Sequence, residues 1–150
     1  MKTRTAFLFA AIAAAISLFA SPKAEAQQAN IDATLILASS QGSGMDPALK
    51  AYESNLRRIF NYKSYKVQGR SGTKVSLPGE STINLPSGQR LTLRGQQSGG
   101  GKIRMSIRWS DGRRTLINTT INMTKGVPAL LGGPQARTQN GDLIIALVAR

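Results

Sequence analysis

The sequence predicts an α+β fold, mostly antiparallel β, in a single small domain built as a sheet or sandwich with one amphipathic helix near 46–60. Two observations predict this fold class. After Tyr62, apolar and polar residues alternate with a period of two, which is typical of half-buried strands. Gly, Pro and Asp interrupt that pattern at short intervals, which favours antiparallel strands over βαβ units.

Residues 1–26 have the features of a signal peptide. The segment begins with Lys2 and Arg4, continues as an uncharged apolar run, and ends in small residues that suit a signal peptidase. We therefore expect residues 27–150 to form an exported β-rich domain, periplasmic or secreted, with no transmembrane segment after cleavage. The alternative is an uncleaved membrane anchor, for which the apolar run is shorter than the roughly 20 residues that span a bilayer.

The first elements expected after the signal peptide are a buried strand and the helix. Residues 31–38 form a short apolar run, and Asp46-Pro47 has the residue types of a helix N-cap followed by a first helical position. Five apolar residues then recur at spacings of three and four, which predicts that they share the packed face of the helix. They are Leu49, Tyr52, Leu56, Ile59 and Phe60.

Short strands separated by turns are expected over the remaining chain. The turn signals include 69–72, Pro78-Gly79, 86–88, 99–101 and 110–112. The expected strands are 63–69, 73–77, 82–85, 89–96, 102–109, 113–123 and 142–149.

The hairpin around Asp111-Gly112 is the best defined of these elements. A three-residue loop with a Gly bulge would pair Trp109 with Arg113 and Ile107 with Thr115, and both apolar faces would then agree. A two-residue Asp-Gly turn would instead set apolar residues opposite polar ones. We therefore predict the three-residue loop.

The chain ends in an apolar run, 142–149, that is apolar on both faces and therefore predicts a central strand. A Gly-Gly dipeptide at 132–133, taken as a turn, precedes this run. In this arrangement the segment 124–149 resembles part of the secretin proteins of bacterial outer-membrane secretion and pilus systems, while the rest of a secretin is absent. The resemblance implies a role in envelope assembly.

The basic charge of the chain belongs to its folded part. The whole chain has 20 Lys and Arg against 7 Asp and Glu, and without Lys2, Arg4, Lys23 and Glu25 these counts are 17 and 6. Such an excess favours polyanionic partners: an acidic protein, an anionic glycan or an anionic lipid surface. The alternative is that the charge serves solubility alone. Export argues against nucleic acid as the partner, and the oligomeric state is left open.

A candidate binding face follows from the strand periodicity. If the apolar residues of 89–96 and 102–109 point into the core, the alternate basic residues gather on the opposite face. This predicts a tentative polyanion-binding set made of Arg90, Arg94, Lys102, Arg104 and Arg108. Asn118, Thr120 and Asn122 would continue that face. The alternative is an ordinary solvated sheet face whose charges prevent aggregation.

The sequence offers little for catalysis or for cofactors. It contains no Cys and no His, which removes thiolate ligands and the usual general base near neutral pH. No spacing of the acidic residues indicates a carboxylate pair or a metal site, so we expect no enzyme activity, no metal and no cofactor. We predict an exported, non-enzymatic binding or assembly module of the bacterial envelope that acts through its basic face. The alternatives are a hydrolase or lyase of envelope polysaccharides, and a structural subunit assembled by strand pairing.

Overall fold

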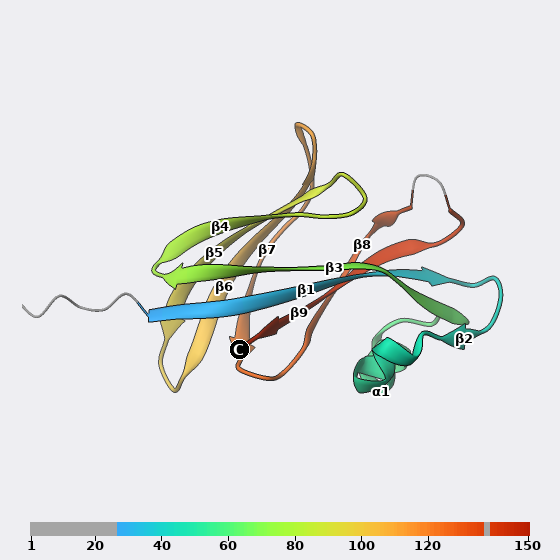
Figure 1. The fold of residues 1–150 in the computed structure, drawn as a ribbon, viewed down its shortest axis with the longest axis horizontal. Helices are drawn as coiled ribbons and strands as arrows, with labels where there is room; N and C mark the ends of the chain where they lie inside the picture. Colours follow the sequence, from blue (N-terminus) through green and yellow to red (C-terminus); the bar gives the residue numbers. More distant parts are fainter. Residues whose placement is uncertain (1–26, 137–138) are drawn as a thin grey trace, which may run out of the picture.

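The computed structural model describes residues 27–136 and 139–150, so the predicted signal peptide lies outside the described residues. Two β-sheets pack face to face, and a short helical segment covers the outer side of one of them (Figure 1). The predicted fold class, mostly antiparallel β with one helix, is confirmed. The strands are β1 (Gln27–Ser39), β2 (Gly44–Met45), β3 (Ser64–Leu77), β4 (Gly79–Asn84), β5 (Arg90–Ser98), β6 (Lys102–Asp111), β7 (Arg114–Thr124), β8 (Ala129–Gln135) and β9 (Asp142–Ala149).

The sheets differ in size and in connectivity. The five-stranded sheet has the order β2-β3-β1-β9-β8, and the four-stranded sheet has the order β4-β5-β6-β7. All pairings are antiparallel except the short β2–β3 pair. The main core lies between the two sheets and contains the fully buried Trp109, whose indole N–H donates to the Gln89 side chain at 2.8 Å.

A second apolar cluster lies on the outer side of the five-stranded sheet, under the helical segment. Ile36, Ile144 and Tyr65 of the sheet pack there against Leu49 and Leu56 of the helix. Strands β1 and β9 are therefore buried on both faces, as the continuous apolar run of 142–149 predicts.

The helical segment begins where predicted, but its first half is a 3₁₀ helix. Residues Pro47–Tyr52 form the 3₁₀ helix η1, residues Glu53–Ile59 form α1, and the Asp46 carboxylate accepts from the Ala48 N–H at 2.9 Å. The prediction that Ile59 belongs to the packed face is wrong, because its side chain is 54% exposed. Ile59 is the last residue of α1, and the chain becomes extended at Phe60, which packs against the outer apolar cluster in its place.

The predicted turn at 69–72 is wrong. Strand β3 runs unbroken through it and pairs with β1 along its whole length, with a bulge between Leu35 and Ile36. Gly69 is needed for packing, since a Cβ there would collide with the ring of Pro86, which lies in the loop between β4 and β5. The glycine therefore marks a close approach of two segments and not a chain reversal.

The hairpin between β6 and β7 has the predicted faces but a different register. Trp109 pairs with Ile117 and Ile107 with Thr119, so the predicted pairings with Arg113 and Thr115 are wrong. The loop is Gly112-Arg113, with Gly112 at φ +58°, and the bulge lies in β7. Both registers leave Ile117, Ile121 and Met123 facing the core, which is why the sequence pattern did not separate them, while Thr115, before the bulge, pairs with Ser110 and is exposed.

Strand β8 is missed by the sequence reading, and the predicted Gly-Gly turn is wrong. Gly132 and Gly133 lie within β8, which forms an antiparallel hairpin with β9. A Cβ at Gly133 would collide with the ring of Trp109, and one at Gly132 would lie 3.0 Å from the ring of Phe60. The two glycines therefore let β8 pass between two aromatic side chains.

Candidate functional site

All five predicted basic residues lie on the outer face of the four-stranded sheet. In β5 and β6 they alternate with core residues such as Leu91, Leu93, Met105 and Ile107, which are fully buried. This surface, called the cationic face below, carries the exposed side chains of Arg90, Arg94, Lys102, Arg104 and Arg108. The placement is as predicted, and the role in binding stays a prediction.

Few carboxylates neutralise this face. Arg94 forms an ion pair with Glu80 of β4 at 3.5 Å, and the two side chains are 68% and 52% exposed. An ion pair so open to water holds its partners weakly. Within 27–136 and 139–150, the other four basic residues have no carboxylate oxygen within ion-pair distance.

The rest of the face is polar and carries no aromatic ring among the described residues. Asn118, Thr120 and Asn122 of β7 extend it as predicted, and all three are exposed. Ser106 and Thr120 share a hydrogen bond of 3.0 Å between their hydroxyl oxygens. Hydroxyl and amide groups therefore flank the basic side chains.

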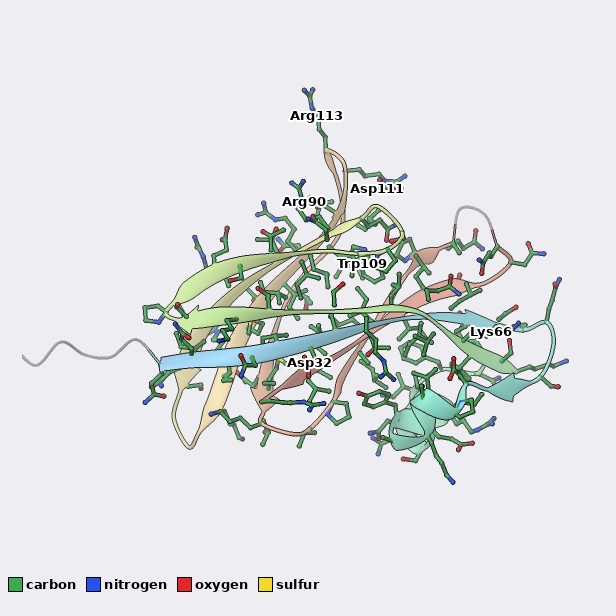
Figure 2. All side chains as sticks on the ribbon, viewed as in Figure 1. Asp32, Lys66, Arg90, Trp109, Asp111 and Arg113 are labelled. Atoms are coloured by element: carbon green, nitrogen blue, oxygen red, sulfur yellow. The ribbon has the colours of Figure 1, made fainter. Side chains whose placement is uncertain are left out.

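The β6–β7 hairpin adds two cations that the sequence analysis left out of the site. Arg113 and Arg114 are exposed, and Arg113 projects from the tip of the hairpin, with Arg90 and Asp111 nearby (Figure 2). The sequence feature that indicates them is their position, since both basic residues directly follow the predicted turn at Asp111-Gly112. They extend the positive potential beyond the sheet.

The segment 62–66 places two tyrosines beside two lysines, residue types that stack on nucleic-acid bases and bind their phosphates, but it does not form such a platform. Tyr65 is fully buried, and its hydroxyl donates to the Phe60 carbonyl at 2.7 Å, as expected for a core residue. Tyr62 donates a hydrogen bond to the Asp142 carboxylate, which together with burial raises the pKa of the Tyr62 phenol to about 12. Both rings therefore have structural partners.

The cavities offer no converging carboxylates among their described lining residues. A cavity of about 330 Å³ is lined by residues such as Leu35, Pro86, Gln89 and Leu143. A neighbouring cavity of about 410 Å³ has one carboxylate among its described lining residues, that of Asp142, which accepts a hydrogen bond from the Tyr62 hydroxyl.

The described residues contain no group of three or more acidic residues placed to hold a metal ion. Ser71 and Lys74 have the S-x-x-K spacing that places a catalytic serine and lysine on one helical turn, but they lie in strand β3, where residues three apart point to opposite faces. In the part of the chain that the structure describes, no helix has the length and apolar character needed to cross a bilayer.

Comparison with known proteins identified no relative of this chain. No protein-family model matches the chain, and no curated protein or solved structure matches it significantly.

Proposed function

We propose that this protein is an exported, non-enzymatic binding or assembly module of the bacterial envelope that uses the cationic face to hold an acidic partner or surface. The observation that supports the proposal is the gathering of five exposed cations on one sheet face, where the described residues form a single weak ion pair with them. Like charges placed this close repel each other and destabilise the folded state modestly, and a polyanion removes that repulsion. The net positive charge of the chain also speeds encounter with anionic partners.

The first prediction replaces Arg90, Arg94, Arg104 and Arg108 with Gln. The variant should elute from a heparin column at a much lower salt concentration than the unaltered protein. The reason is that a protein with fewer cations displaces fewer counterions from heparin when it binds. Thermal unfolding should change little, since these side chains are exposed.

The matched control removes four cations that lie away from the cationic face, in the helical segment and in β3, by changing Lys50, Arg57, Arg58 and Lys66 to Gln. Both variants lose four positive charges. Each set also contains one ion-paired arginine, Arg94 with Glu80 and Arg57 with Glu53, so the loss of an ion pair is matched as well. The control should elute close to the unaltered protein. Equal losses of retention in the two variants would contradict a localised binding face.

A structural role by strand pairing is a second candidate, and strand β7 favours it. Three of the sheet edges carry protective features: β2 has two residues, β4 is short and follows Pro78, and β8 contains Pro134 and a bulge. Strand β7 has eleven residues, no charge between 115 and 124, and no ladder partner other than β6 among the described strands.

The pattern of β7 fits a second copy of the same strand. Antiparallel pairing centred on Thr119 would place Ile117 opposite Ile121 of the copy, so that two half-buried apolar residues cover each other.

The second prediction tests this pairing with Thr119→Lys, since a lysine that points inward on an edge strand blocks strand addition. Sedimentation should show a dimer that Thr119→Lys converts to monomer, while Thr82→Lys on β4 leaves the dimer intact. A monomeric unaltered protein at the highest soluble concentration would refute strand pairing.

A further inference from the structure

The cations of the cationic face form a line and not a cluster. Strands β5 and β6 pair in five rows on this face, and each row contains one basic and one uncharged residue. No two cations are directly opposite each other, so the closest like-charge contact in a sheet is avoided. The rows are Arg90–Ser110, Thr92–Arg108, Arg94–Ser106, Gln96–Arg104 and Ser98–Lys102.

The rows have a regular spacing along the strands. Successive rows are two residues apart, which corresponds to about 6.8 Å, so the first and last cations are separated by about 27 Å along the sheet. The cations alternate between β5 and β6 over the first four rows, and the line follows the boundary between these two strands. Arg113 continues it at the hairpin tip (Figure 2).

We infer that the ligand of the cationic face is a linear acidic polysaccharide, bound along β5 and β6 with its anionic groups in register with the five rows. The inference rests on the proposed function and specifies its partner. Four of the five cations are arginines, whose guanidinium groups bind carboxylate or sulfate through two parallel hydrogen bonds. A linear chain satisfies one cation after another, whereas a single small anion would use only one or two.

The flanking strands supply groups suited to sugar hydroxyls. Hydroxyl and amide side chains stand beside the line on both sides, from β4 and from β7. These groups donate and accept hydrogen bonds without charge, as neutral sugar hydroxyls require. They include Thr82, Asn84, Asn118, Thr120 and Asn122.

The composition of the face argues against other polyanions. It has no aromatic side chain among the described residues, so it lacks the stacking groups of single-stranded nucleic-acid sites. It also lacks described apolar side chains that could enter a bilayer, and the exposed large apolar residues of 27–136 and 139–150, Ile59 and Val127, belong to α1 and to the β7–β8 loop. Charge and hydrogen bonding are therefore the available means of recognition.

The third prediction uses two double variants that keep the net charge. Arg94→Ser with Ser106→Arg keeps one cation in each row, because residues 94 and 106 are paired. Arg94→Thr with Thr82→Arg empties that row and moves its cation to β4, beside the row of Arg108. Both variants lose Arg94 and therefore its ion pair with Glu80.

The affinity of each variant is measured with size-fractionated heparin oligosaccharides and galacturonic-acid oligomers. The second variant should bind about two- to fivefold more weakly than the unaltered protein, the value of one exposed charge contact, and the first should bind more tightly than the second. The affinity of an oligomer for one cationic face should also rise with oligomer length until the oligomer spans about 27 Å. Longer oligomers should then bind one face no more tightly. Thermal unfolding of both variants verifies that they are folded.

The outcomes separate the inference from the proposed function. Binding that is equal in both variants and independent of length would overturn the linear arrangement and leave a diffuse cationic surface. Stronger binding to anionic phosphatidylglycerol vesicles than to either glycan would overturn the polysaccharide in favour of a lipid surface. If the unaltered protein bound none of these probes, the proposed function itself would fail.

Discussion

The two outer faces of the sandwich have opposite surroundings. On the five-stranded sheet, residues such as Ile36, Ala38 and Ile144 are buried because the helical segment packs over them. On the four-stranded sheet, the equivalent outward positions are exposed or half-buried and are basic or polar, and no described element covers them. Both sheets bury their inner faces in the same core.

The difference shows that the fold itself does not require the cations. A solvated sheet face needs only polar residues, and threonine and asparagine already fill most of the outward positions of β4 and β7. Five cations in five successive rows therefore exceed what solubility demands of a sheet face, whereas the covered face depends on apolar contacts for stability.

The fourth prediction tests this comparison through stability. Ile144→Ala on the covered face should lower the free energy of unfolding by about 2–5 kcal/mol, because a fully enclosed side chain leaves a cavity. Gln96→Ala on the exposed face should change it by less than about 0.5 kcal/mol. Urea denaturation of the two variants measures both values, and similar losses would mean that the exposed face is also structurally constrained.

The fifth prediction concerns Tyr62, which belongs to the covered side, and has a smaller effect. Its pKa is raised from 10.0 to about 12 by the hydrogen bond to Asp142, so the unfolded chain loses the phenolic proton at lower pH than the folded protein does. The contribution of Tyr62 to stability is fully present below about pH 10 and is lost as the pH rises to about 12.

Tyr62→Phe removes this titration. The difference in unfolding free energy between the unaltered protein and Tyr62→Phe should therefore shrink between about pH 10 and pH 12. Urea denaturation at several pH values in that range measures it. A difference that stays constant with pH would show that the Tyr62–Asp142 bond does not couple to folding.

The sequence predicted the parts of the structure that depend on local periodicity. Alternation in 89–96 and 102–109 identified the core and the outer faces of β5 and β6, and Asp46-Pro47 identified the start of the helical segment. Glycines were the main source of error. Gly69, Gly132 and Gly133 indicated turns locally, but contacts with Pro86, Phe60 and Trp109, distant in sequence, explain them.

The candidate site was predictable in its composition but not in its order. Periodicity placed Arg104 and Arg108 on one face, yet the arrangement of one cation per row depends on the pairing of β5 with β6. Register depends on loop geometry and on bulges, as the shifted β6–β7 hairpin shows. A linear arrangement could therefore not be derived from the sequence alone.

The most direct test of the cationic face is an NMR titration of the ¹⁵N-labelled protein with a heparin oligosaccharide that spans the five rows. We predict that the backbone amide shifts concentrate in 90–98 and 102–110, with little change in the helical segment 47–59. Shifts that concentrate on the helical segment, or that are spread equally over both outer faces, would contradict the account.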